Sequence, residues 1–464
     1  MKMLLRFVYT KFFVILQSQT PFIMTFHKKS FIVILLFFVT RLSIAQAQPL
    51  QLTTNIKANV IENLSASLLK NYIFSDTAIK MANFLKSHLK NKDYESITNP
   101  NEFAQKLTTD LLSVYRDIHL AVNYNPQLEN VLKNTSEINS SQVQEQNLQN
   151  ARQQNFGFKK IEILSGNIGY VYFDRFFGLN EFSKETISGV FSFLKHTNAL
   201  VIDLRNNGGG SPDMVKYICS YFFKEKTHIN NLYERRISKA EEYWTEPLSN
   251  SSNFPSLPLY ILVNRRTFSA AEEFAYDLQS LHRATIIGET TGGGAHPVSA
   301  ETIGNGFIGN IPYARAINPI TGKNWEATGV KPDVQINADS SLDAAVLSYY
   351  DFQIKTLKDS NSIKTIKWSR DMLNAKLHPF SIDTLTLKTY LGNFADRIVS
   401  YENSMLYFTG RDGKKSKLIA LTRTTFKIEN TDNLKVEFLP TTTGDVSELA
   451  FIFDDGFVTT YKRK

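Results

Sequence analysis

The chain has a single cysteine, Cys219, among its 464 residues. One cysteine excludes an intramolecular disulfide, a metal site built from several cysteines and a lipid-bearing cysteine at an export cleavage point. Cys219 lies in the apolar stretch 215–223, which predicts a small, buried hydrophobic side chain. Apolar runs are also short. The run 31–39 has nine residues, whereas a membrane-spanning helix needs about 20.

The net charge is small once the first 48 residues are set apart. The formal net charge is +8, and those residues hold six Lys or Arg and no acidic residue. Subtracting these six leaves +2 for the remainder, which is close to balance. The basic character therefore belongs to the leader and gives no reason to expect a nucleic-acid partner.

The leader itself has the order of a secretory signal. Basic residues 27–29 precede the apolar run 31–39, and the small-residue site Ala45-Gln46-Ala47 follows it. We expect cleavage after Ala47, a natural start at Met24, and an exported protein that is periplasmic or secreted. The alternative is that the segment stays attached as an anchor.

Hydrophobic spacing divides the chain into parts with different predicted structure. Helical periodicity comes first, then a segment rich in Asn, Gln and Ser, then strands alternating with helices, and finally short alternating strands separated by turn residues. We expect a leader (1–47), an N-terminal helical domain (48–126), a polar linker (127–157), an α/β core (158–350), a connector (351–380) and a small antiparallel β domain (381–464). The core strands are predicted at 168–173, 199–204, 257–263 and 284–287, and its helices at 183–194, 212–223, 269–281 and 341–357.

Three turns at the ends of predicted core strands could carry chemistry. The first is DLRNNGGG at 203–210, where consecutive glycines allow a backbone to approach a substrate and to aim N–H groups at a developing negative charge. A phosphate cradle is the competing idea, but no Gly-Lys-Ser/Thr ending follows. A purely structural glycine turn also fits this segment taken alone.

The second turn is TFSAAE at 267–272, and it places Ser269 at the start of a predicted helix. The helix dipole and the free N–H groups there favour an oxyanion, and the Ala270 N–H would be one donor. The alternative is an ordinary N-cap serine that forms a capping box with Glu272.

The third turn is GETTGGGAHP at 288–297, which would line a cleft or simply turn the chain. A nucleophilic serine needs a base. Two of the eight histidines lie near these loops, His119 and His296, and spacing alone does not choose between them.

Together with EATGVKPD at 326–333, these motifs resemble the tail-specific or C-terminal-processing serine peptidases. The resemblance is narrower with the branch that holds the tricorn protease core and the interphotoreceptor retinoid-binding repeats. It runs from about residue 52 to about residue 350. It implies a crotonase-like (ClpP-like) α/β core, with Ser269 as nucleophile and the N–H groups of Gly209 and Ala270 as the oxyanion hole.

The same resemblance indicates which base the chain would use. The lysine of the dyad branch would fall at Gly294, and residues 267–322 contain no lysine. The tricorn-like branch takes its base from an Asp-x-His sequence, which Asp117-Ile-His119 fits, and a glutamate that Glu326 fits. The serine that this branch can place beside its histidine is replaced by Ile118.

The resemblance therefore implies an exported serine endopeptidase that acts on proteins or peptides through an acyl-enzyme on Ser269. His119 would be the base and Glu326 its support, and no metal or organic cofactor is expected because no ligand cluster is visible. The rest of the cleft or substrate-binding surface is predicted at Arg205, Asn207, Gly208, Gly210, Gly292, Gly293 and His296. The rival interpretation is an inactive protein that binds hydrophobic ligands or peptides. A third interpretation is that the C-terminal β domain binds a component of the cell envelope.

Overall fold

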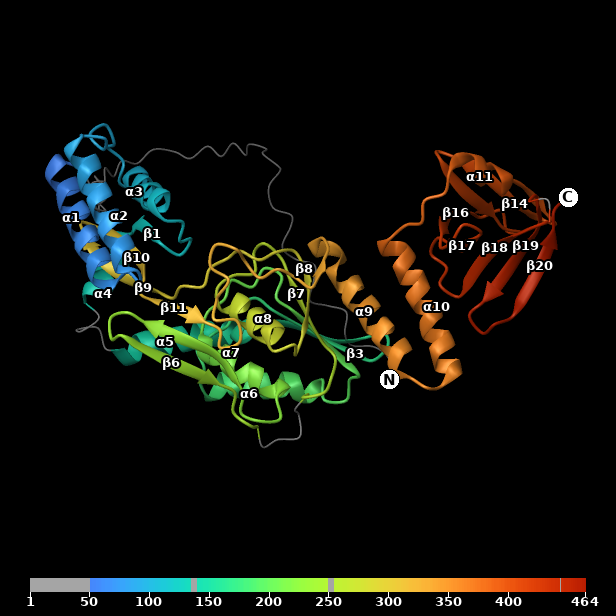
Figure 1. The fold of residues 1–464 in the computed structure, drawn as a ribbon, viewed down its shortest axis with the longest axis horizontal. Helices are drawn as coiled ribbons and strands as arrows, with labels where there is room; N and C mark the ends of the chain where they lie inside the picture. The colour runs from blue at the N-terminus through green and yellow to red at the C-terminus, as the bar shows by residue number, and fades with distance from the viewer. Residues whose placement is uncertain (1–50, 135–139, 249–253, 443) are drawn as a thin grey trace, which may run out of the picture. The chain divides into compact units, whose positions relative to one another are not determined.

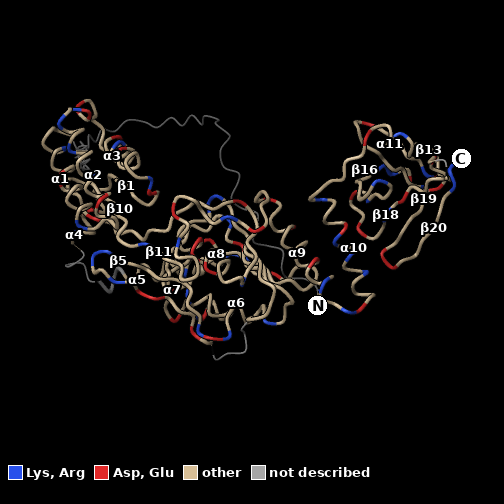
Figure 2. The backbone as a smooth tube through the Cα atoms, in the orientation of Figure 1, with Lys and Arg blue, Asp and Glu red and all other residues tan. Residues whose placement is uncertain are grey.

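The computed structural model describes residues 51–464 apart from 135–139, 249–253 and 443 (Figure 1). The predicted leader and its cleavage site lie outside the described residues. Residues 50–464 form one compact unit. Among the helices in the described ranges, none combines the length and apolar character required to cross a bilayer. Lys and Arg are interspersed with Asp and Glu along the described backbone (Figure 2).

A six-stranded sheet forms the centre of the α/β core, in the order β12-β8-β7-β4-β3-β2. Only β2 runs antiparallel to its neighbour, and the other strands are parallel. Its strands are β2 (Phe158–Leu164), β3 (Ile168–Phe173), β4 (Ala199–Asp203), β7 (Leu259–Val263), β8 (Thr285–Gly288) and β12 (Val334–Gln335). β4 and β7 are buried along their whole length, as expected for strands covered on both faces.

Helices cover both faces of this sheet. One face packs against α6 (Glu181–Phe193), α7 (Pro212–Cys219) and α8 (Ala270–Ser280), and the other against α9 (Ser341–Thr356). The mixed α/β core predicted from the sequence is confirmed. The predicted strands and helices agree with the observed ones to within two residues, except that α7 ends at Cys219 and a short 3₁₀ turn, Ser220–Phe222, follows. Cys219 is buried, as predicted.

The N-terminal helices α1 (Thr54–Asn71), α2 (Ser75–Lys90) and α3 (Pro100–Val114) pack on a small sheet that is not local in sequence. β1 (Ala121–Tyr124) pairs with β10 (Phe307–Pro312), which pairs with β9 (Val298–Gly304). Ile303, Phe307 and Ile311 share the hydrophobic cluster of these helices. The structure thus differs from the predicted division, because residues 298–312 pack with the helical part.

Most of the described residues in the segment predicted as a polar linker, 127–157, are helical. α4 (Pro126–Lys133) begins where the Asn125 side chain accepts the N–H of Leu128 and Pro126 occupies the first turn, and α5 (Ser140–Gln153) follows. The Glu129 carboxylate accepts the Gly306 N–H at 2.7 Å, which ties α4 to the β9–β10 hairpin. Composition did not indicate this structure, because the Asn125 cap and the long-range contact of Glu129 with Gly306 help to order α4.

The remaining strands complete two further sheets. β11 (Ala314–Ile317), β5 (His228–Glu234) and β6 (Lys239–Trp244) form an antiparallel sheet.

α10 (Ser360–Leu377) occupies most of the predicted connector 351–380, and α11 (Thr384–Thr389) follows it. The C-terminal part is an antiparallel meander of β13 (Gly392–Phe394), β14 (Arg397–Glu402), β15 (Met405–Thr409), β16 (Lys415–Ala420), β17 (Thr425–Ile428), β18 (Leu434–Pro440), β19 (Val446–Phe453) and β20 (Val458–Lys462). An isolated bridge joins Phe394 to Arg463, near the two ends of the meander. The antiparallel pairing of the eight strands confirms the predicted C-terminal antiparallel sheet.

Helix α8 buries two carboxyl groups one turn apart, Glu273 and Asp277. The Asn230 amide donates to Glu273 and the Asn318 amide to Asp277, and Asp277 Oδ2 has no partner among the described residues. Burial raises the pKa of Glu273 to about 7, with Asp213 of α7 adding to the effect. Burial and the charge of Glu273 also raise the pKa of Asp277. Folding therefore favours the neutral form of both groups.

Stability should consequently fall as the pH rises through the mildly acidic range. Between the ordinary pKa of 4.5 and the folded value of about 7, the native state keeps a proton on Glu273 that the unfolded state releases. Glu273→Gln should remove the part of that dependence that comes from Glu273. Between pH 5 and pH 8 the variant should therefore gain about 3 kcal/mol of stability relative to the unchanged protein. Urea midpoints at the two pH values measure it, with exposed Glu185→Gln as the control. Equal pH slopes in both variants would contradict the interpretation.

Candidate active site

The three loops singled out from the sequence lie side by side, because β4, β7 and β8 are adjacent parallel strands. Each loop follows the carboxyl end of its strand, so all three emerge at one edge of the sheet. Backbone bonds join them. The Phe268 N–H donates to the Asn207 carbonyl at 3.0 Å, and the Gly292 N–H donates to the Thr267 carbonyl at 3.0 Å. The structure therefore brings the three predicted motifs together around Ser269.

Ser269 has an unusual backbone conformation, with φ of 55° and ψ of −123°. An ordinary N-cap has negative φ in the extended region, as Thr53, Asn99 and Asn180 show in this chain. A non-glycine residue at positive φ costs of order 1–3 kcal/mol, and such strain concentrates at functional positions. The side chain is half-buried and so remains accessible. These features distinguish Ser269 from a residue that only caps α8.

Glu272 holds the strained turn in place from the first turn of α8. Its carboxylate is fully buried and accepts the N–H of Ser269 at 2.9 Å. It also accepts the N–H groups of Gly293 at 2.6 Å and Gly294 at 2.8 Å, and the Thr291 hydroxyl. Burial raises the pKa of Glu272, while these hydrogen bonds oppose the rise. From the sequence, Glu272 is expected only as part of a capping box, and its contacts with residues 291–294 are evident only in the structure.

The predicted oxyanion donors differ in availability. Ala270 begins α8, and its N–H has no acceptor among the described backbone groups and side chains. Gly209 lies directly against this turn, because a Cβ built on it would come within 2.8 Å of the Ala270 nitrogen and of Ser269 Cβ. Its own N–H, however, donates to Asn207 Oδ1 at 2.9 Å. Ala270 is therefore the donor that is free in this structure.

The other residues of the first loop mostly shape it. Asn207 is buried and donates its amide to the Phe173 carbonyl at 2.9 Å. Gly208 has open space at its Cβ position, whereas a Cβ on Gly210, at φ of 141°, would collide with the Phe176 carbonyl. Close backbone approach, rather than side-chain chemistry, explains the glycines at 209 and 210.

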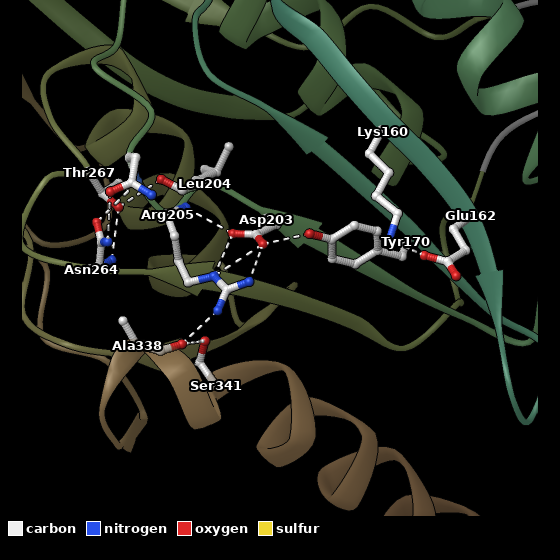
Figure 3. Close-up of polar contacts among 11 residues, drawn as sticks. Lys160, Glu162, Tyr170, Asp203, Leu204, Arg205, Asn264, Thr267, Ala338 and Ser341 are labelled. Carbon is white, nitrogen blue, oxygen red and sulfur yellow. Dashed lines mark hydrogen bonds and ion pairs between the residues drawn. The ribbon is translucent and has the colours of Figure 1, made fainter.

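Arg205, which was predicted to lie in the cleft, makes contacts within the fold. Its guanidinium pairs with Asp203 through Nη2 at 2.6 Å and donates to the Ala338 carbonyl at 2.6 Å (Figure 3). Asp203 also accepts the Tyr170 hydroxyl at 2.7 Å. Arg205 thus connects the end of β4 to the turn before α9, and its donors are used in holding the fold.

His119 lies beside the serine turn. It follows α3, and its ring packs on Phe268 with centroids 4.5 Å apart and planes tilted by 35°. A Cβ built on Gly294 would lie 2.4 Å from His119 Cε1 and 2.4 Å from Phe268 Cζ. A side chain at position 294 and the imidazole therefore exclude each other. Burial lowers the pKa of His119 to about 4, so the ring is neutral near pH 7.

His296 is placed differently, deep in a carboxylate network. It is 2% exposed, its Nδ1 lies 2.8 Å from Asp117 Oδ2 and 3.5 Å from Glu326 Oε2, and its ring meets Phe74 edge to face. Asp117 also accepts the Tyr72 hydroxyl at 3.0 Å. The polar contacts of the His296 ring named here are thus with the carboxyl groups of Asp117 and Glu326, whereas the His119 ring packs on Phe268.

Glu326 lies between the two histidines and the glycine loop. Its Oε2 accepts the Ala295 N–H at 2.6 Å, and its Oε1 is buried without a hydrogen-bond partner among the described residues. Burial raises the pKa of Glu326 to about 7, and His296 opposes that shift. Donor atoms of Asp117, His119 and Glu326 all lie within 4.8 Å of one another. The Asp-x-His sequence and Glu326 are therefore brought together, although about 200 residues separate them.

Two protein-family models match parts of this chain. Residues 167–336 match the model for "Peptidase family S41", and residues 44–157 match the "N-terminal domain of Peptidase_S41 in eukaryotic IRBP". A Staphylococcus aureus (strain COL) protein named "Probable CtpA-like serine protease" is 26% identical over 216 residues, which is 46% of this chain and 42% of that protein. The "Carboxy-terminal processing protease CtpA" of Bacillus subtilis (strain 168) is 24% identical over 230 residues, 48% of this chain and 46% of that protein.

These curated relatives are thus matched over less than half of their own length. Among solved structures, a photosystem II D1 C-terminal processing protease aligns with a TM-score of 0.40 and 15% identity, covering 61% of this chain and 93% of that one.

Proposed function

The chain belongs to peptidase family S41, and on that premise we propose that it is a serine endopeptidase that cleaves proteins or peptides through an acyl-enzyme on Ser269. The observation that carries the proposal is the conformation of Ser269. Its φ of 55° sets the hydroxyl at a strained strand-to-helix turn, with the free Ala270 N–H beside it. Strand-to-helix turns of this kind present a nucleophile at the edge of a sheet.

We assign the base to His119 rather than to His296. Packing on Phe268 places the His119 ring next to the residue that precedes Ser269. The lowered pKa leaves this ring neutral and able to accept the serine proton. His296 instead directs Nδ1 at Asp117 and is 2% exposed. His296 is therefore assigned to positioning Asp117 and Glu326.

In the proposed reaction, His119 takes the Ser269 proton as the hydroxyl oxygen attacks the peptide carbonyl. The resulting oxyanion is stabilised by the Ala270 N–H, and by the Gly209 N–H once its bond to Asn207 opens. Glu326 faces the imidazolium that forms and stabilises it by charge. His119 then protonates the leaving amine, and water releases the acyl group by the reverse sequence of proton transfers.

A serine-directed fluorophosphonate tests the proposal directly. The unchanged protein should gain one covalent adduct, located on Ser269 by peptide mass spectrometry, and Ser269→Ala should gain none. Ser238→Ala, in the turn between β5 and β6, is the control and should react like the unchanged protein. A folded chain that does not react would favour the binding-protein interpretation instead.

Two further properties are part of this proposal. We propose that the six-stranded sheet and its helices form a crotonase-like (ClpP-like) core, which the placement of the site at the carboxyl ends of β4, β7 and β8 supports. We also propose export by the leader, on the basic, apolar and small-residue order of residues 27–47. Sequencing the N-terminus of protein recovered from the source cell's exterior or periplasm would show whether cleavage follows Ala47.

A further inference from the structure

The cluster beside Ser269 contains a set of metal-ligating side chains that the sequence does not reveal. Asp117 and His119 lie between α3 and β1, and Glu326 lies between β11 and β12. One donor atom from each falls within 4.8 Å of the other two. The three come together only because the N-terminal helical part packs against the loops of the core.

Two donor atoms in this cluster have no use in the fold. His119 Nδ1 and Glu326 Oε1 are buried and lack hydrogen-bond partners among the described residues. The Glu326 side chain is 7% exposed, so solvent reaches it poorly. Leaving a buried polar atom unpaired costs about 1–3 kcal/mol. The cluster therefore has unfilled capacity for a group that accepts lone pairs.

We propose that this cluster binds one Zn²⁺ or similar transition-metal ion through Asp117, His119 and Glu326, and that the bound ion inhibits the peptidase. One imidazole with two carboxylates is a donor set that Zn²⁺ accepts in a tetrahedral site, with solvent as the fourth ligand. Mg²⁺ and Ca²⁺ prefer oxygen ligands alone, so they should bind far more weakly.

The geometry needs little adjustment. Zn²⁺ holds nitrogen and oxygen ligands at about 2.0–2.2 Å, which sets tetrahedral donors about 3.3–3.6 Å apart. Small side-chain rotations bring donors that start within 4.8 Å to this spacing. Outer contacts already orient one ligand, because the Asp117 carboxyl group is hydrogen-bonded to His296 Nδ1 and accepts the Tyr72 hydroxyl. Such outer contacts commonly strengthen metal sites.

Inhibition follows from the imidazole chemistry and rests on the proposed function. A neutral imidazole has one nitrogen lone pair and one N–H. When the lone pair is given to the metal, the ring has none left to accept the Ser269 proton. The ion also occupies the carboxylate that would face the imidazolium. Metal binding and general-base catalysis at His119 therefore exclude each other.

Binding is tested separately from activity, by titrating ZnCl₂ into chelator-stripped Ser269→Ala protein in a calorimeter. We expect one ion per chain with a dissociation constant in the micromolar range or tighter, and at least tenfold weaker binding in Ser269→Ala proteins that also carry His119→Ala or Glu326→Gln. The control, Ser269→Ala with His88→Ala, removes a histidine that pairs with Asp93 outside this cluster and should bind as before. Co²⁺ added to the Ser269→Ala protein should give the visible absorption of a tetrahedral site. Absence of saturable binding, or binding that survives loss of His119 and Glu326, would overturn the proposal.

The second arm measures inhibition of the unchanged protein. Zn²⁺ should suppress fluorophosphonate labelling and peptide hydrolysis with the constant found by calorimetry, and EDTA should restore both, whereas Mg²⁺ should have no effect. If the folded chain neither reacts nor hydrolyses peptides but still binds Zn²⁺ at these residues, the peptidase proposal fails and the metal site stands. Full activity with the metal bound would refute the inhibition.

Discussion

Replacing His119 with alanine should lower kcat/KM for peptide hydrolysis by about 10²–10⁴-fold, because a positioned general base contributes about that much. Thermal stability should change little by comparison. The ring packs on Phe268, but its Nδ1 has no hydrogen-bond partner to lose among the described residues. Initial rates and melting temperatures of the same preparations separate the two effects.

His296→Ala is the matched comparison, because it removes the other histidine of the same cluster. It should leave Asp117 and Glu326 as buried carboxyl groups without the imidazole nitrogen that lies 2.8 Å and 3.5 Å from their oxygens. Removing one partner of a buried pair costs about 3–5 kcal/mol, so the main loss should be in stability. If the protein with His296→Ala is folded and loses more activity than that with His119→Ala, the assignment of the base would move to His296.

The architecture of the core was predictable from local patterns. Apolar runs such as 199–203 have the length and composition of buried parallel strands, and periodic segments such as 341–356 read as amphipathic helices. The loops of the candidate site were predictable for the same reason, because each follows the carboxyl end of a predicted strand. The resemblance to a peptidase family, rather than any predicted strand order, led us to expect the motifs at 203–210 and 267–272 in one site.

Long-range contacts decided what the sequence left open. Periodicity could not show that β9 and β10 join the N-terminal helices, because the pairing of β1 with β10 spans almost 190 residues. Nor could spacing choose between His119 and His296, since the difference lies in what each ring touches. Arg205 shows a contact that the sequence did not indicate. Its place beside the glycine loop suggested substrate contact, but the structure directs its guanidinium to Asp203 and Ala338.

Glu272→Gln should be the most damaging conservative change near the site. The carboxylate accepts hydrogen bonds from three backbone N–H groups and one hydroxyl, on Ser269, Thr291, Gly293 and Gly294. An amide keeps the shape but offers one oxygen, and its NH₂ group would face N–H donors. We expect a loss of about 2–4 kcal/mol of stability, since hydrogen bonds to charged groups contribute about 1.5–3 kcal/mol each.

The same change should slow chemistry beyond its effect on stability. Glu272 fixes the backbone of Ser269 and also holds Gly294, where the His119 ring occupies the space that a side chain would need. Loosening both positions moves the nucleophile and the base relative to each other. Misplacement by about 1 Å can cost about 10²-fold in rate. Fluorophosphonate labelling well below the melting temperature should therefore be at least tenfold slower, with kcat falling more than KM rises. Glu289→Gln, at the more exposed start of the same loop, is the control and should label normally. A normal labelling rate in folded Glu272→Gln protein would limit Glu272 to a role in stability.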